Sequence, residues 1–377
     1  MADNKENKVL NVPALRFPEF TGEWERHKLS EVCSFYSGGT PSSSKKEYYN
    51  GNIPFIRSGE LHKDYTELFI TEAGLSNSAA KLVETGDLLL ALYGATSGDI
   101  AISKIKGAIN QAILCIRTKQ DKKFIESVWN KHVERLLQTY LQGGQGNLSS
   151  DIVKNIPFYF ANSEEQDKLA KFISLLDERI ATQNKIIEKL ETLIKGIRHK
   201  VFKQLRKDFG FNSTIGDILS FEQPQRYIVS SAEYSNDDTF IPVLTANKAF
   251  ILGYTTETDG IYDKGDCIII DDFTLDCKYV SFPFKVKSSA IKILTANNKF
   301  ILRYTYEYLK SLELSTEEHK RHYITEIQPY SCVLPDENTL KTIALVFENL
   351  AYKLSNEQSL ALILNKQRQY LLSKMFI

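Results

Sequence analysis

The residues of this sequence that could do chemistry are hydrogen-bonding side chains gathered in polar loops. The loop that begins Gly38-Gly39-Thr40-Pro41 is too polar to lie in a core. Its hydroxyl groups, backbone amides and lysines suit contacts to phosphates and to the edges of bases. The candidate DNA-binding residues of this loop are Thr40, Ser42, Ser43, Lys45 and Lys46.

Comparable side chains recur in loops of both halves of the chain. Glutamine and asparagine can hold adenine with two hydrogen bonds, and arginine can do the same for guanine. The segment 142–150 is rich in amide and hydroxyl groups, and Gln223-Pro224-Gln225-Arg226-Tyr227 takes the place of the first loop in the second half. One such loop alone is more often only solvated, but matching places in two halves favour binding. The further candidates are Arg57, Tyr93, Gln145, Asn147, Gln223, Gln225, Arg226, Tyr227, Thr245, Asn247, Lys248, Tyr254 and Lys278.

Motifs for catalysis are incomplete. Asn52-Ile53-Pro54-Phe55 and Asn155-Ile156-Pro157-Phe158 lack the paired prolines of the adenine methyltransferase motif, and no glycine-rich strand-to-helix turn could hold S-adenosylmethionine. Gly143-Gly144-Gln145-Gly146-Asn147 is not followed by Gly-Lys-Ser/Thr, so it is not a phosphate-binding Walker loop. We therefore expect no catalytic residue and no cofactor on this chain.

Two clusters of side chains are candidates for binding a metal ion. His319 and His322 lie near two glutamates, but no further ligand pair is close, and a polar helix face explains them better than a metal site. Asp271-Asp272 with Asp276 could bind a cation, accept hydrogen bonds from cytosine amino groups, or simply meet solvent. We expect no metal.

The composition is that of an ordinary globular protein, with 42% hydrophobic and 25% charged residues. Forty-seven basic residues balance 47 acidic ones, which by itself argues against nucleic acid, yet Ile194–Lys207 holds only basic charges. The start is polar rather than a signal peptide, and the apolar runs are too short for a membrane. Five cysteines without a CxxC pair predict a cytoplasmic protein with reduced, mostly buried thiols.

The segment from Leu169 to Val201 carries the heptad pattern of a coiled coil. Its apolar residues alternate at spacings of four and three, with a polar interruption at Gln183. The segment Asn162-Ser163-Glu164-Glu165 before it offers an N-cap oxygen and first-turn acids. The seam residues of this helix are Leu169, Ile173, Leu176, Ile180, Ile187 and Leu190.

A second seam lies 174 residues further on. It also has a polar member at its fifth position, and Asp336 precedes it as an N-cap candidate. Pairing the two helices antiparallel within one chain would place Arg368 beside Asp177. The seam residues of the second helix are Ile343, Phe347, Leu350, Leu354, Leu364 and Leu371.

The sequence also contains an internal repeat. Leu29-Ser30-Glu31-Val32-Cys33-Ser34-Phe35 reappears 186 residues later as Ile215-Gly216-Asp217-Ile218-Leu219-Ser220-Phe221, and Gly86-Asp87-Leu88-Leu89-Leu90 returns as Gly265-Asp266-Cys267-Ile268-Ile269. Short β-branched and aromatic runs fill both copies, with helical patterns near 122–141 and 300–312. Two copies of one unit, each followed by a long helix, indicate one task performed at two places.

Several motifs of the chain are shared with one family. They are Arg16-Phe17-Pro18-Glu19-Phe20 with Trp24, Gly38-Gly39-Thr40-Pro41, Gly86-Asp87-Leu88-Leu89, Tyr93-Gly94-Ala95-Thr96, Asn110-Gln111-Ala112, Gly143-Gly144 before Ile156-Pro157, and Glu164-Glu165-Gln166. Together with the order of unit, heptad helix, unit and heptad helix, they make the chain resemble the specificity subunit of type I restriction–modification systems.

The resemblance implies an α+β fold with an internal pseudo-two-fold repeat. Two target-recognition domains of mixed α/β type, at 21–161 and 211–334, would be separated by an intramolecular antiparallel coiled coil of two spacer helices, at 162–210 and 335–377. Residues 1–20 would form an N-terminal lead-in.

The resemblance also implies a non-catalytic subunit that reads a bipartite, asymmetric sequence in double-stranded DNA. Two modification subunits, which carry S-adenosylmethionine, would dock on the spacer, and ATP-dependent restriction subunits could join them. Two other classes compete with this interpretation. A coiled-coil adaptor would bind only proteins and would show no steep salt dependence with DNA, whereas a self-contained methyltransferase would need no partner.

Overall fold

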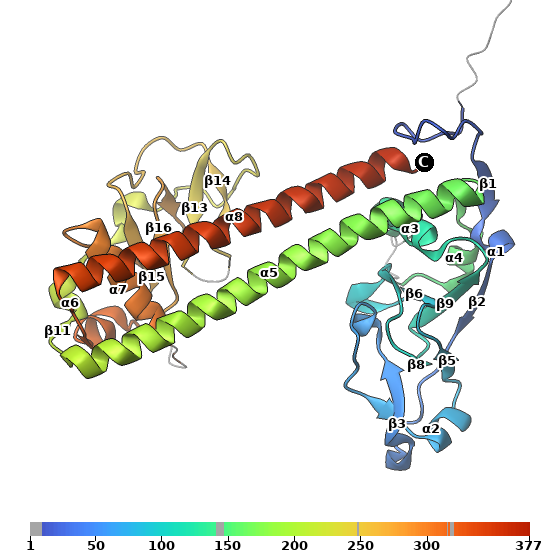
Figure 1. The fold of residues 1–377 in the computed structure, drawn as a ribbon, viewed down its shortest axis with the longest axis horizontal. Helices are drawn as coiled ribbons and strands as arrows, with labels where there is room; N and C mark the ends of the chain where they lie inside the picture. The colour runs from blue at the N-terminus through green and yellow to red at the C-terminus, as the bar shows by residue number, and fades with distance from the viewer. Residues whose placement is uncertain (1–9, 141–146, 247–248, 315, 317–319) are drawn as a thin grey trace, which may run out of the picture. The chain divides into compact units, whose positions relative to one another are not determined.

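A computed structural model describes residues 10–140, 147–246, 249–314, 316 and 320–377. Its contacts divide the chain into two compact units. The first unit comprises residues 1–183 and 360–377, and the second comprises residues 184–359. The two long helices are α5 (Ser163–Phe209) and α8 (Glu337–Met375) (Figure 1). One part of each helix belongs to the first unit, and its other part belongs to the second.

The first unit contains two four-stranded sheets, of order β2-β9-β6-β7 and β4-β3-β8-β5, and the strand pair β1-β10. All paired neighbours are antiparallel except β3 and β8. The elements are β1 (Glu25–Lys28), α1 (Leu29–Val32), β2 (Cys33–Ser37), η1 (Lys46–Tyr48), β3 (Tyr49–Ile56), η2 (Ser58–Glu60), β4 (Phe69–Ile70), α2 (Glu72–Ser76), β5 (Lys81–Val83), β6 (Leu88–Ala91), η3 (Gly94–Thr96), β7 (Ile100–Ile102), β8 (Gly107–Ile109), β9 (Ile113–Thr118), α3 (Lys122–Tyr140), α4 (Ser150–Asn155) and β10 (Pro157–Phe160).

The core of the first unit lies between its sheets and helix α3. Strand β6 is an uninterrupted apolar run that is buried on both faces, as expected for a central strand. The indole nitrogen of Trp129 on α3 donates to the carbonyl of Gly98, 2.8 Å away, which ties the helix to the turn before β7. On its other side α3 meets the end of α8, where the rings of Phe124 and Phe376 lie 5.5 Å apart.

The lead-in and the start of α5 are joined by buried polar contacts. The guanidinium of Arg16 donates to both carboxylate oxygens of Glu165, at 2.7 and 2.6 Å, and the indole of Trp24 donates to the same group at 3.2 Å. Glu165 is buried, so a paired guanidinium is what makes its charge tolerable there. The contacts among Arg16, Trp24 and Glu165 therefore join the N-terminal segment to the start of helix α5.

The second unit repeats this architecture. Its four-stranded sheet has the order β12-β18-β15-β16, its three-stranded sheet the order β14-β13-β17 with β13 and β17 parallel, and β11 pairs with β19. The elements are β11 (Ser213–Thr214), α6 (Ile215–Ile218), β12 (Ser220–Glu222), η4 (Pro224–Tyr227), β13 (Ile241–Leu244), β14 (Ile251–Thr255), β15 (Cys267–Asp271), β16 (Cys277–Val280), β17 (Lys285–Val286), β18 (Ile291–Thr295), α7 (Lys299–Ser311), η5 (Tyr323–Ile327) and β19 (Ser331–Cys332).

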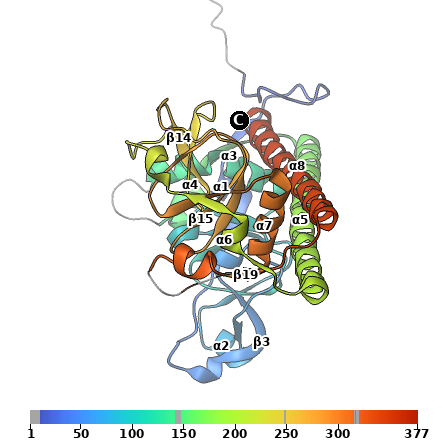
Figure 2. The ribbon, with the colours of Figure 1, turned by 90° about the vertical axis from the view of Figure 1, so that its left-hand side faces the viewer.

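The two units correspond strand for strand in their principal sheets. In both sheets the strand that comes first in the sequence lies at one edge and pairs with the last, which is followed by the second and the third. The strands β2, β9, β6 and β7 therefore correspond to β12, β18, β15 and β16, and each unit also contains one parallel strand pair. The short helices α1 and α6 precede equivalent strands, and α3 and α7 occupy equivalent places in the chain. Figure 2 shows α7 between its sheet and the long helices, and ring contacts of Phe202 with Tyr304 and Tyr308 fill that layer. The internal repeat predicted from the sequence is confirmed.

The long helices pair with each other inside each unit. In the second unit Gln358 donates to Glu191, and the rings of Phe202 and Phe347 stack 6.4 Å apart, so residue numbers fall on one helix as they rise on the other. The pair is antiparallel, as the heptad register predicts. Each predicted seam residue is buried or half-buried.

The helix starts also follow the sequence. The side chain of Asn162 accepts the backbone N–H of Glu165 at 2.9 Å, and that of Asp336 accepts the backbone N–H of Thr339 at 3.0 Å. Both are N-caps, which satisfy backbone donors that a helix leaves free. The predicted N-caps are therefore confirmed.

All five cysteines are free thiols, four of them buried and Cys33 half-buried. No helix in the described parts of the chain is both long and apolar enough to cross a membrane. A cytoplasmic location stays a prediction. The predicted domain boundaries also stay predictions, because the compact units cut across the long helices instead of ending at their termini.

Candidate nucleic-acid interface

The polar loop of the first unit leaves strand β2 through two glycines that have no room for a side chain. A Cβ atom on Gly38 would lie 1.8 Å from the carbonyl oxygen of Ile109, and one on Gly39 would lie 2.6 Å from the Cβ of Ala79. The close approach fixes the path of the loop. Pro41 and Tyr48 are then buried at either end of the polar stretch.

The predicted binding residues within and directly before this stretch face solvent. Thr40, Ser42, Ser43, Lys45 and Lys46 are all exposed. The hydroxyl of Thr40 donates to the side-chain oxygen of Gln111 at 2.8 Å, and the Nζ of Lys45 donates to the hydroxyl of Tyr48 at 2.9 Å. The loop thus presents hydroxyl and ammonium groups from a fixed frame, although no contact here tests DNA binding.

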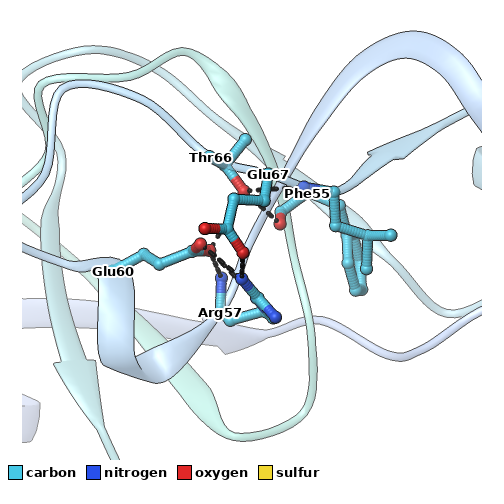
Figure 3. A network of polar contacts seen from close by, with 6 residues as sticks. Phe55, Arg57, Glu60, Thr66 and Glu67 are labelled. Atoms are coloured by element: carbon cyan, nitrogen blue, oxygen red, sulfur yellow. Dashed lines mark hydrogen bonds and ion pairs between the residues drawn. The ribbon is translucent and has the colours of Figure 1, made fainter. Parts of the chain in front are cut away.

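Arg57 lies in a different environment from the one its sequence position suggests. Its guanidinium donates to Glu60 at 2.7 Å and to Glu67 at 2.9 Å, and Thr66 donates to Glu60 at 3.0 Å (Figure 3). Burial raises the pKa of Glu60, but the hydrogen bonds from Arg57 and Thr66 outweigh this and lower it to about 2. Arg57 therefore closes the loop after β3, and reading guanine would require it to leave a carboxylate.

The other predicted residues of the first unit lie in two places. Tyr93 is 38% exposed at the start of η3, and Asn147 is exposed before α4. Gln145 lies outside the described residues. Their part in binding stays a prediction.

The first loop of the second unit has the same design. Pro224 and Tyr227 are buried within the turn η4, and the hydroxyl of Tyr227 donates to Glu222 at 2.8 Å. Gln223, Gln225 and Arg226 are exposed beside them. Tyr227 is only 5% exposed, so in this conformation it anchors the turn while its neighbours are available to a ligand.

A buried lysine that sequence reasoning missed contacts this loop. The Nζ of Lys292 on β18 lies 2.9 Å from the side-chain oxygen of Gln223 and 3.1 Å from a carboxylate oxygen of Asp272. Lys292 is 1% and Asp272 2% exposed. A lysine inside the apolar run Ile291–Leu294 is the sequence signal that could have pointed to it, because a buried ammonium needs partners.

Two members of the acidic cluster of the second unit, Asp271 and Asp272, are buried and have structural roles. Asp271 accepts the backbone N–H groups of Phe273 and Thr274, each at 2.9 Å, and Asp272 accepts those of His322 and Tyr323. Within the described ranges no group of three His, Cys, Asp or Glu residues could hold a metal ion. Of the candidate histidine pair, His319 lies outside the described residues.

The remaining predicted residues of the second unit are less available. Thr245 is 8% exposed, and Tyr254 and Lys278 are half-buried on β14 and β16. Asn247 and Lys248 lie outside the described residues. The exposed residues Gln223, Gln225 and Arg226 therefore carry the candidate site in this unit.

The long helices expose apolar stripes that the seam prediction did not identify. The seam residues are buried or half-buried, which leaves them little surface for contact with another protein. Spacings of seven and eleven residues return to nearly the same side of an α-helix, and both helices expose large apolar groups at these spacings. The groups are Leu175, Ile186 and Leu193 on α5, and Leu345, Tyr352, Ile363 and Tyr370 on α8.

Known proteins share this organisation. Residues 21–192 match the model of the type I restriction modification DNA specificity domain. Residues 21–192 of this chain are therefore similar to a type I restriction modification DNA specificity domain. The specificity subunit of type I restriction enzyme EcoR124I/EcoR124II from Escherichia coli is 44% identical over 141 residues, which is 36% of this chain and 35% of that protein. The MjaIX specificity subunit from Methanocaldococcus jannaschii is 27% identical over 241 residues, 55% of each chain.

The matched segments thus span about a third to about half of the length of these specificity subunits. The fold likeness extends further. A crystal structure of a type I restriction–modification system S subunit from M. genitalium covers 97% of this chain and 99% of its own, with a TM-score of 0.67 at 17% identity. A chain from a study of complex assembly and conformational transition of the type I R-M system covers 94% and 97%, with a TM-score of 0.51 at 14% identity. The predicted fold class, with mixed α/β units and long helices, is confirmed.

Proposed function

We propose that this chain is the DNA sequence-specificity subunit of a type I restriction–modification complex and that it binds a bipartite, asymmetric target. The observation that carries the proposal is the matched pair of loops. Each unit presents exposed polar side chains beside a buried proline and a buried tyrosine, directly after an equivalent strand. Because the side chains differ between the loops, the two half-sites differ in sequence.

The first half-site is read by the loops of residues 36–48 and 142–150, and the second by the loops of residues 222–228 and 245–255. The chain itself is not catalytic and binds no cofactor. The exposed members of each loop make the contacts to bases and phosphates, whereas the buried tyrosines fix the loop backbone.

The partners are two modification subunits, which carry S-adenosylmethionine, and in some assemblies restriction subunits. The exposed stripes on α5 and α8 support docking by a protein. Apolar side chains at regular helical spacing suit contact with helices of a partner. The alternative, an adaptor that binds only proteins, would use the same stripes but would leave the polar loops without a task.

Salt dependence of duplex binding by the assembled complex tests the proposal. Each phosphate contact changes the slope of log K against log salt by about −0.9, so a steep slope is expected. Replacing Lys45 and Lys46 by glutamine should make the slope shallower by up to about 2. The control is Lys106→Gln, a lysine already paired with Glu84 at 3.1 Å, which should leave the slope unchanged. An adaptor would show no steep slope and no effect of either change.

A further inference from the structure

The ammonium group of Lys292 is held rigidly inside the second unit. Burying a charged amine is costly unless it is paired and hydrogen-bonded, and Asp272 provides the paired charge at 3.1 Å. That carboxylate is itself fixed, because its other oxygen accepts the backbone N–H groups of His322 and Tyr323 at 3.1 and 2.8 Å. The Nη1 of Arg321 also lies 3.8 Å from this carboxylate. Lys292 itself cannot turn away from Asp272 without leaving its buried ammonium without a paired charge.

The fixed ammonium decides which way the amide of Gln223 faces. A lysine ammonium can only donate hydrogen bonds, so the atom of Gln223 that meets it, 2.9 Å away, must be the carbonyl oxygen. The amide nitrogen is consequently directed away from Lys292. Nowhere in the described chain does an acceptor meet this nitrogen, and the side chain is exposed. Gln223 thus presents two unused N–H groups to solvent.

We propose that Gln223 reads the second half-site through its amide N–H groups, with Lys292 and Asp272 as positioning residues. A free glutamine can offer one donor and one acceptor and so hold adenine through N6 and N7. Lys292 uses one lone pair of the Gln223 oxygen and holds that oxygen toward the buried ammonium. The outward-facing N–H groups of Gln223 therefore favour a base that shows acceptors in the major groove. Guanine offers two of them, at N7 and O6, whereas the exocyclic amine of cytosine offers a donor and is rejected. The inference rests on the proposed function and adds the chemistry of one contact to it.

The experiment is selection of bound duplexes from a randomised library by the assembled complex, followed by sequencing. In the Gln223→Glu variant the carboxylate still accepts from Lys292 but has no donor left. One base pair of one half-site should change from an acceptor-bearing base to cytosine, because carboxylates accept from the cytosine amine. Affinity for the original target should fall about tenfold or more, while the other half-site stays unchanged.

The double variant Lys292→Met, Asp272→Asn tests the positioning role separately. It removes both buried charges together, and the asparagine oxygen can still accept the two backbone N–H groups. The amide of Gln223 is then free to turn over, so adenine should be accepted beside guanine at the same position. A purely structural lysine would change thermal stability without changing the preferred base.

Gln225→Glu is the matched control, because Gln225 is exposed on the same turn but does not contact Lys292. It should leave the base pair read by Gln223 unchanged, and any preference that it alters should belong to another base pair. If it changes the Gln223 base pair to cytosine as well, added charge rather than orientation is responsible and the inference is wrong. If the wild-type complex selects a split motif that Gln223→Glu leaves untouched, the inference also fails while the proposed function stands. If the wild-type complex selects no motif, the proposed function itself fails.

Discussion

The guanidinium Nε of Arg368 on α8 lies 2.5 Å from the carboxylate of Asp177 on α5. The other oxygen of this carboxylate lies 2.6 Å from the Nζ of Lys123 on α3. One acidic side chain therefore connects both long helices to the globular part of the first unit. The heptad register predicted the contact between Arg368 and Asp177, but it gave no sign of Lys123.

Asp177→Ala should destabilise the first unit by about 1–3 kcal/mol. The change leaves two half-buried cations without their shared partner, which costs more than losing an exposed ion pair. Urea unfolding of the chain measures the loss. Asp167→Ala removes an exposed acid from the same helix and should stay within about 0.5 kcal/mol. Equal effects of the two changes would contradict the structural role of Asp177.

The stability that Asp177 contributes should disappear in acid. Burial raises the pKa of Asp177, but the hydrogen bonds from Arg368 and Lys123 outweigh it and leave the pKa below its ordinary value. A carboxylate whose pKa is lower in the folded than in the unfolded state stabilises the fold above the unfolded pKa, which is about 3.9. As pH falls through the folded pKa, the free-energy difference between wild type and Asp177→Ala should shrink toward zero. A difference that grows in acid would show that the pairing is wrongly assigned.

Gly38→Ala should weaken binding to the first half-site about tenfold or more. The added Cβ would meet the carbonyl oxygen of Ile109 at 1.8 Å, so the polar loop must move away from its frame. Gly22→Ala is the control, because nothing lies within 4 Å of a Cβ there. Binding assays on duplexes with one half-site altered at a time would locate the loss. Loss confined to the second half-site would be inconsistent with the assignment of this loop.

Ile363→Asp should impair assembly with the modification subunits. Ile363 is 60% exposed in the middle of the α8 stripe, so a charge there opposes docking without entering the helix seam. Lys353→Asp introduces the same acid about 100° around the helix from Tyr352 and should assemble normally. Co-purification with the modification subunit measures the effect. Assembly that survives Ile363→Asp but fails with Lys353→Asp would place the docking surface elsewhere.

Much of the fold could be predicted because its signals are periodic or repeated. The spacing of Leu169, Ile173 and Leu176 predicts a seam between paired helices, and the repeat of Leu29–Phe35 predicts a second unit. The strand pairing that defines the sheets joins segments far apart in the chain, such as β2 and β9, and spacing alone does not indicate it. Local sequence motifs therefore predicted where helices and repeated units lie along the chain, but they did not predict which strands pair in the sheets.

The candidate site was predictable in composition but not in geometry. The exposed residues of both loops were found because polar groups cluster there. The ion pairs of Arg57 with Glu60 and Glu67 and the burial of Tyr227 depend on neighbours that a loop sequence does not reveal. Lys292 was missed for the same reason, because its partners lie 20 and 69 residues away.

Sequencing that detects N6-methyladenine, in a host carrying this chain and its modification subunit, tests the central claim most directly. The wild-type complex should methylate adenines within one split, asymmetric motif. Replacing residues 212–334 by the corresponding domain of another specificity subunit should change one half of that motif and leave the other half intact. A contiguous motif, or a replacement that alters both halves or neither, would contradict the account.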